Sequence, residues 1–159
     1  MSGGPEIHFR AAVKDDAAAC ANVLRRSIIE LCIEDHGNDP EFIAGWTANK
    51  TPEFVATLIA NPDSFVLVAE RRQSIVGVGA CNRLGEITLN YVSPEAQFMG
   101  VSSGLLSGLE AIVRETGHGV ARLTSTSTAR SFYGGRGYVD DGTPVEWRGT
   151  LAFPMRKRL

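Results

Sequence analysis

The sequence predicts a mixed α/β fold of the α+β kind, with a mostly antiparallel central sheet of about seven strands flanked by about four helices. Three observations support this prediction. Two β-rich runs around the polar turn at 71–74 predict an antiparallel hairpin. Segment 100–117 follows a further strand and places its apolar residues at helical spacing. Residues 145–159 are expected to form two closing strands. The 159 residues, 43% of them hydrophobic, are enough for one compact domain spanning 1–159.

The N-terminal third predicts a strand, a helix and an irregular segment. Residues 7–13 alternate and are rich in β-formers, and Asp15 or Asp16 can cap the helix that follows. Segment 34–62 contains several prolines and glycines among short apolar groups, so one or two short helices with loops are expected there. The buried stripe of the first helix consists of Val23, Leu24, Ile28 and Leu31.

The middle of the chain predicts three consecutive antiparallel strands. The hairpin strands cover 65–69 and 75–80, and a third strand runs over 86–92. Pro94 ends the third strand because proline has no N–H to donate to a neighbouring strand.

The C-terminal half predicts an amphipathic helix, a short strand, a second helix and the closing strands. The first helix begins near Gly100 and stops by Gly117 or Gly119, the strand covers 120–124, and the second helix covers 129–136. The buried stripe of the long helix consists of Leu105, Leu106, Leu109, Ile112 and Val113.

Composition and charge disfavour several classes of function. The net charge of -2 and the pI near 5.9 provide no basic field, so no nucleic-acid partner is expected. The cysteines and histidines lack short ligand spacings, which predicts reduced core cysteines and no metal site. The start of the chain lacks the features of a signal peptide, and no apolar run approaches membrane-spanning length. A cytoplasmic protein without a membrane partner is expected.

The loop 97–104 has the features of an anion-binding site. It lies between a strand and an amphipathic helix, where unpaired N–H groups and the positive end of the helix dipole meet. Gly100 and the small side chains of Ser102 and Ser103 would let a diphosphate approach the backbone closely. By itself, the loop is better explained by serines that merely cap a helix, since short glycine motifs recur by chance.

Two other glycine motifs fail the context that their chemistry requires. The G-x-S-x-G pattern at 100–104 would need an acid and then a histidine after Ser102, but only His118 follows, at the end of the next helix. An α/β-hydrolase is therefore disfavoured. Gly77-x-Gly79 lies inside a strand and opens no helix, so it indicates close packing in the hairpin rather than dinucleotide binding.

Three blocks in a fixed order resemble the GNAT superfamily of N-acetyltransferases. The first is E-I-T-L-N-Y-V-S-P at 86–94, the second is Gln97-x-x-Gly100-x-Ser102, and the third is A-R-S-F-Y at 129–133 with a following Gly-Tyr. The resemblance implies a single GNAT domain over 1–159 that takes acetyl-CoA as its cosubstrate and acetylates the amine of a small molecule or peptide. Homodimers through the last strands are frequent among similar proteins.

The resemblance also implies a set of residues that bind the coenzyme. Backbone N–H groups of the loop would hold the pyrophosphate, and the strand carrying Val92 would splay from its neighbour and pair with the pantetheine arm. The amide of Val92 would polarise the thioester carbonyl. Ser102 stands where similar enzymes usually have glycine or alanine, and Thr126 stands where they often have asparagine. The implied coenzyme-binding residues are Leu89, Tyr91, Val92, Gln97, Met99, Gly100, Val101, Ser102, Ser103 and Phe132.

The chemistry of acetyl transfer needs a proton acceptor and a proton donor. An alkylamine is mostly protonated near neutral pH, so a base must remove a proton directly or through water. Glu86 is the candidate base because it lies eleven residues before Gln97, as in histone-acetylating members of the family. Tyr133 is the candidate acid for the departing thiolate, whose basicity is close to that of a phenol. An exposed glutamate and a packed aromatic pair are the structural alternatives.

The acceptor pocket is expected after the first helix. Glu34, His36 and Trp46 combine a carboxylate with aromatic rings, a combination that suits a cationic amine. A solvated acidic helix end with anchoring aromatics fits the same residues equally well. A non-catalytic acetyl-CoA sensor of the same fold is the alternative function. An acetyltransferase acting on aminoacyl-tRNA would want a basic face that the chain does not clearly have.

Overall fold

The computed structural model describes residues 6–159, and residues 1–5, where no signal peptide was expected, lie outside the described residues. No helix of the described part is long and apolar enough to cross a membrane. The elements in chain order are β1 (His8–Ala11), η1 (Lys14–Asp16), α1 (Ala17–Leu31), α2 (Ile33–His36), α3 (Pro40–Thr47), α4 (Pro52–Ala60), β2 (Ser64–Arg71), β3 (Ser74–Asn82), β4 (Ile87–Val92), η2 (Pro94–Ala96), α5 (Val101–Glu115), β5 (Val120–Ser125), α6 (Arg130–Gly134), β6 (Val139–Asp140), β7 (Val145–Trp147) and β8 (Thr150–Arg158).

The predicted mixed α/β fold with antiparallel strands is confirmed. The first four strands form one antiparallel sheet in the order β1-β2-β3-β4. Arg72 and Gln73 form the β2–β3 turn with φ values of 53° and 66°, as a tight hairpin turn requires. The strand after α5 and the closing strands form a second group in the order β5-β8-β6, with β7 also paired to β8. The two-residue strand β6 was not anticipated.

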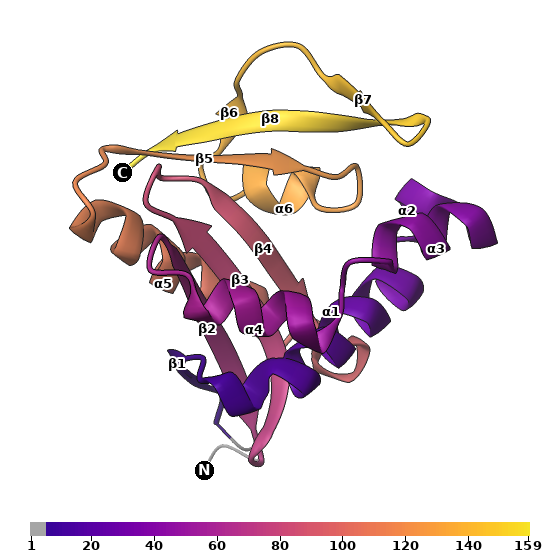
Figure 1. Ribbon diagram of the computed structural model, residues 1–159. Helices are drawn as coiled ribbons and strands as arrows, with labels where there is room; N and C mark the ends of the chain where they lie inside the picture. The colour runs from indigo at the N-terminus through magenta and orange to yellow at the C-terminus, as the bar shows by residue number, and fades with distance from the viewer. Residues whose placement is uncertain (1–5) are drawn as a thin grey trace.

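The two groups of strands meet at β4 and β5. Glu86 and Arg122 form an isolated parallel bridge there, and the N–H of Arg122 donates to the carbonyl of Gly85 at 3.0 Å. Beyond this bridge, β4 and β5 are not paired within the described residues. Figure 1 shows the group containing β5 and β8 above the first sheet, with β4 leading up to it. The strand carrying Val92 is therefore separated from its neighbour, as expected.

Helices cover both faces of the first sheet (Figure 1). Apolar side chains of α1 and α4 pack with Val68 and Val78 on one face, and α5 packs on the other. A Cβ atom at Gly77 would lie 2.4 Å from Cγ1 of Val101, and one at Gly79 would lie 3.0 Å from Leu109. These glycines therefore serve close packing, as predicted, but the surface that approaches them is helix α5.

Segment 33–60 contains more helix than expected. Three helices, α2, α3 and α4, occupy it, and two of them begin at prolines. Asp39 accepts a hydrogen bond from the N–H of Glu41 at 3.1 Å, and Thr51 Oγ1 accepts one from the N–H of Phe54 at 3.1 Å. Proline fits the first helical turn because its missing N–H would have no partner there. Pro40 therefore starts a helix rather than interrupting one.

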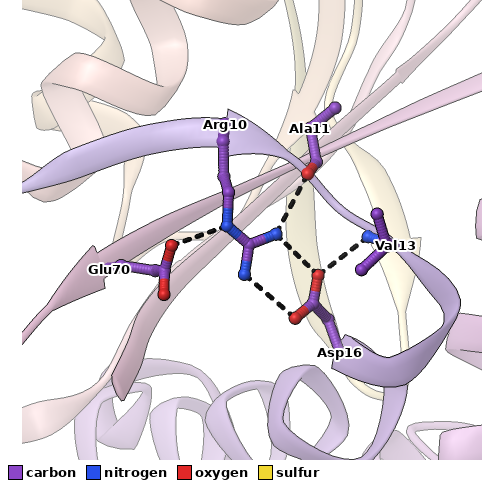
Figure 2. A network of polar contacts seen from close by, with 5 residues as sticks. All are labelled: Arg10, Ala11, Val13, Asp16 and Glu70. Carbon is purple, nitrogen blue, oxygen red and sulfur yellow. Dashed lines mark hydrogen bonds and ion pairs between the residues drawn. The ribbon is translucent and has the colours of Figure 1, made fainter. Parts of the chain in front are cut away.

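The first helix begins beside a partly buried ion-pair network (Figure 2). Asp16 occupies the N-cap of α1, but its carboxylate makes no capping bond to that helix. It accepts instead from the N–H of Val13 at 2.8 Å and from two nitrogens of Arg10 at 2.8 and 3.0 Å. Arg10 Nε also donates to Glu70 at 2.6 Å. The network ties β1, β2 and the start of α1 together.

Candidate active site

A cavity of about 560 Å³ lies where β4 and β5 separate. It reaches from the α1–α2 side of the sheet to the N-terminus of α5 and the helix α6. Its walls bring together elements that are far apart in the sequence. The lining residues are Ser27, Leu31, Cys32, Ile87, Thr88, Leu89, Asn90, Tyr91, Val92, Ala96, Gln97, Phe98, Gly100, Val101, Ser102, Ser103, Leu123, Thr124, Ser125, Thr126, Thr128, Ala129, Phe132, Tyr133 and Arg136.

The edge of β4 presents backbone donors to this cavity. The N–H of Ser93 donates to the carbonyl of Val76 at 2.8 Å, next to the register pair Gly77–Val92. Because hydrogen bonding alternates along an antiparallel pair, the N–H groups of Asn90 and Val92 point away from β3 and toward β5. These are the amides that a ligand between the strands would meet.

The loop before α5 presents a second set of backbone donors. Gly100 is the N-cap residue with a φ of 80°, a left-handed conformation that glycine adopts without strain. The first N–H groups of the helix have no partner within it, and the first turn carries no acidic residue. Phe98 projects from the loop with 95% of its surface exposed. His118, which a hydrolase would need beside Ser102, lies past the other end of α5, 2.6 Å from the carbonyl of Arg83.

Arg136 is a cavity residue that sequence reasoning missed. Its Nε and Nη2 donate to Ser103 Oγ at 3.1 and 2.5 Å. Its guanidinium carbon lies 3.9 Å from the centre of the Phe132 ring. No carboxylate of the described residues forms a salt bridge with it. The available signal was a basic residue at the end of the predicted helix 129–136, although α6 itself already ends at Gly134.

Tyr133 lies in the cavity wall on α6 and is buried. Its ring packs edge-on against Phe132 and Tyr138, with centroid distances of 5.2 and 5.6 Å. Burial raises the pKa of Tyr133 to about 12, and the nearby amide of Asn90 acts in the opposite direction. Among the described residues, no hydrogen bond of normal geometry joins the hydroxyl of Tyr133 to the side-chain amide of Asn90. The phenol therefore keeps its proton at neutral pH, as a proton donor must.

Asn90 connects β4 with the loop that precedes α5. Its Nδ2 donates to the carbonyl of Ser102 at 3.3 Å. Its Oδ1 is buried and has no protein partner within the described residues. The carbonyl of Ser102 determines the orientation of the amide, because only the nitrogen end can donate to it. Sequence reasoning did not single out this residue.

The implied coenzyme-binding residues line the cavity except for Met99, and the candidate base Glu86 also lies outside the lining. Glu86 is exposed at the start of β4, where its Oε1 accepts a hydrogen bond from Asn82 at 3.3 Å. Its neighbours Ile87 and Thr88 line the cavity, whereas Glu86 is not among the lining residues. Met99 is also outside the lining and is 43% exposed.

The three residues expected to wall the acceptor pocket do not line the cavity either. His36 is buried, with its Nε2 2.8 Å from the carbonyl of Ile28 and its Nδ1 accepting from the N–H of Asn38 at 2.9 Å. Trp46 packs edge-on against Trp147 with a centroid distance of 4.6 Å. Glu34 is exposed on α2. Trp46 thus packs as an anchoring aromatic, as in the alternative interpretation, whereas His36 is buried instead of belonging to a solvated helix end.

Asp35 holds the loop between β5 and α6. It is buried and accepts hydrogen bonds from the N–H groups of Ser127 and Thr128, at 2.8 and 3.3 Å, and from the hydroxyl of Thr128. Thr126 Oγ1 accepts from the N–H of Ala129 at 3.3 Å at the start of α6. These bonds determine where α6 begins, and hence where Tyr133 lies.

The comparisons with known proteins agree with this architecture. The family model described as acetyltransferase (GNAT) domain matches residues 34–159. No curated protein sequence matches the chain.

Several solved structures have a similar fold. A GCN5-related N-acetyltransferase from Rhodopseudomonas palustris is 23% identical, with a TM-score of 0.86 over 100% of this chain and 99% of that chain. PaiA N-acetyltransferase from Thermoplasma acidophilum, solved in complex with coenzyme A, is 22% identical, with a TM-score of 0.81 over 97% and 99%. YncA from Salmonella typhimurium, solved with its cofactor acetyl-CoA, is 19% identical, with a TM-score of 0.66 over 96% and 94%.

Proposed function

The chain belongs to the GNAT acetyltransferase family, and we propose that residues 1–159 form one domain that transfers an acetyl group from acetyl-CoA to an amine. The observation that carries the proposal is the cavity between the separated strands β4 and β5. It joins the N-terminus of α5 to the buried phenol of Tyr133.

Acetyl-CoA is the cosubstrate, and the lining residues fit it. The unpaired N–H groups of 101–103 suit the pyrophosphate, since a helix N-terminus with no acidic residue in its first turn favours an anion. The free edge of β4 suits the amides of the pantetheine arm. The coenzyme complexes of PaiA and YncA, which have the same fold, support this placement.

The proposed reaction is direct attack of a neutral amine on the thioester carbonyl. The new C–N bond forms as negative charge develops on the carbonyl oxygen, which the N–H of Val92 would stabilise. The amine loses a proton to Glu86, directly or through water, since Glu86 is near the cavity but not in its lining. The C–S bond then breaks, and Tyr133 gives its proton to the leaving sulfur.

The protonated state of the Cys32 thiol supports direct attack by the amine rather than an acetyl-enzyme intermediate. Cys32 is the one described cysteine in the cavity lining. Burial raises its pKa to about 12. Because the thiolate is the nucleophilic form, this side chain is a poor acceptor of the acetyl group at neutral pH.

The acceptor end of the cavity supports an amine with an uncharged body. Ser27, Leu31 and Cys32 line that end, and none of the described lining residues is aspartate, glutamate or histidine. A polycationic acceptor would leave its extra charges without carboxylate partners there. We therefore propose a small molecule or a peptide end that presents one amine. The cytoplasmic location and the homodimer remain predictions.

The test begins with calorimetry of acetyl-CoA binding to the unaltered protein. Thiol release is then followed across a panel of monoamines, polyamines and peptides, with Glu86→Gln and Tyr133→Phe beside the parent chain. We expect micromolar binding, turnover of at least one monoamine, and loss of turnover without loss of binding in the variants. Failure to bind the coenzyme would overturn the proposal, and binding with no turnover on any amine would favour the non-catalytic sensor.

A further inference from the structure

We propose that Arg136 binds a phosphate of the cosubstrate at the N-terminus of α5, and that this contact makes the protein favour the full coenzyme over its pantetheine part. The inference rests on the proposed function, because it concerns the same cavity. It adds a charged side chain to a site otherwise made of backbone donors.

Arg136 is held in one orientation at the mouth of the cavity. Two of its nitrogens donate to Ser103 Oγ in the first turn of α5, and Nη1 donates to the carbonyl of Phe132 at 3.3 Å. The guanidinium also stacks on the Phe132 ring at 3.9 Å. A charged group oriented before binding loses less side-chain entropy when a ligand arrives.

The charges around Arg136 are unbalanced. The N-terminus of α5 carries roughly half a positive charge from the helix dipole, and its first turn contains no acidic residue. Arg136 carries a full positive charge, and its hydrogen bond to Ser103 in that first turn places this charge beside the helix N-terminus. Six other arginines of the described chain have carboxylate partners that offset their charge, namely Arg10, Arg26, Arg83, Arg122, Arg130 and Arg156, whereas Arg136 at the cavity forms no salt bridge within the described residues. Two positive groups meeting without a counter-charge favour an anionic ligand between them.

A phosphate suits this arrangement better than the other groups of the coenzyme. The planar fork of a guanidinium matches the geometry of phosphate oxygens, and the adjacent N–H groups of 101–103 can share the same anion. The pantetheine arm carries no charge that could use Arg136. Both the diphosphate and the 3′-phosphate of coenzyme A have the required chemistry, and the ligand series below distinguishes them.

The experiment is calorimetry with coenzyme A, dephospho-coenzyme A and pantetheine, the last at millimolar concentration. The parent chain is compared with Arg136→Gln and with Arg114→Gln, which makes the same charge change near the other end of α5. We expect Arg136→Gln to weaken coenzyme A binding about 10- to 100-fold, the range for a charged hydrogen bond, and to leave pantetheine binding unchanged. Arg114→Gln should stay within about 2-fold of the parent.

The outcomes distinguish contact with the diphosphate from contact with the 3′-phosphate. They also distinguish a failure of this inference from a failure of the proposed function. If Arg136→Gln weakens dephospho-coenzyme A as much as coenzyme A, the contact is with the diphosphate; if only coenzyme A is weakened, it is with the 3′-phosphate. Equal affinity of the parent and Arg136→Gln for coenzyme A would overturn the inference while leaving the proposed function intact. Equal weakening of pantetheine would overturn it too, since the role would then be structural. A parent chain that binds none of the three ligands would overturn both.

Discussion

Tyr133 is a side chain whose chemistry depends on burial. Burial raises its pKa to about 12. The phenol therefore stays protonated even at pH ~10, where an ordinary tyrosine is half ionised. We expect kcat to show no loss from deprotonation of this acid between pH ~8 and ~10. The measurement is a pH profile of kcat with saturating substrates. A descending limb with its midpoint near pH ~10 would contradict the raised pKa of Tyr133, since that is where an unperturbed phenol ionises.

The variant Tyr133→Phe provides the control for that profile. It removes the hydroxyl and keeps the packed ring, so we expect kcat to fall about 100- to 10,000-fold, the usual contribution of a general acid. The affinity for acetyl-CoA should change by no more than about 3-fold, because the ring contacts remain.

Asp35 is a second residue whose role follows from its partners. Its carboxylate accepts three hydrogen bonds from Ser127 and Thr128. Asp35→Asn replaces one acceptor oxygen by a donor that faces other donors, so we expect a loss of about 1–3 kcal/mol in the free energy of unfolding. Urea unfolding measures it. Asp15→Asn, the same change at an exposed site, should stay within about 0.5 kcal/mol, and an equal loss in both variants would contradict the assigned role.

At the scale of elements, α5 is positioned by its close approach to β3. Gly77→Ala would place a Cβ atom 2.4 Å from Val101 Cγ1, and overpacking of this kind costs about 1–3 kcal/mol. We expect that loss in urea unfolding, together with weaker coenzyme binding, because Val101 begins the helix that faces the cavity. Gly119→Ala, where nothing lies within 4 Å, is the control. Similar stabilities of the two variants would show that β3 and α5 can adjust.

The junction of β1, β2 and α1 should respond to acid (Figure 2). The hydrogen bonds from Arg10 hold the pKa of Asp16 below its ordinary value of 3.8. A lowered pKa in the folded state adds stability above the ordinary value, and that stability is lost as the pH falls through the lowered one. We expect Asp16→Asn to be less stable at neutral pH. It should also lose less stability than the parent between pH ~5 and ~2.5 in urea unfolding, and parallel pH curves would refute the linkage.

At the scale of the whole molecule, the two groups of strands touch at β4 and β5 through one described bridge and enclose the cavity beyond it. A ligand bound there contacts both groups. At about 100 times its Kd, acetyl-CoA should stabilise the protein by about 2.7 kcal/mol and raise the Tm by about 5–10 °C for a chain of this size. Thermal unfolding measures the shift, and hydrogen exchange should slow in β4 and β5. Protection confined to other elements would contradict this binding site.

Much of this protein follows from patterns that neighbouring residues create. The β-rich runs of β2 and β3, the apolar stripe of α5 and the turn at Arg72 are local signals, and they predicted the fold class and the hairpin correctly. The position of the loop at Gly100, between a strand and a helix, is equally local. The same kind of reasoning expected one or two short helices in segment 34–62, where three form, because a proline that breaks a helix and one that starts it differ only in the residues that cap the turn.

Tertiary structure decided which side chains face the cavity. His36 and Trp46 were expected at the acceptor pocket, but both are buried by packing with distant partners. Arg136 reaches Ser103 across 33 residues, and Asp35 reaches Ser127 across 92 residues. No sequence pattern encodes such pairs, because hydrophobic periodicity specifies only which face of an element is buried. The sequence alone therefore determined the elements, the class of fold and the family resemblance, whereas the packing of separate elements determined the composition of the site.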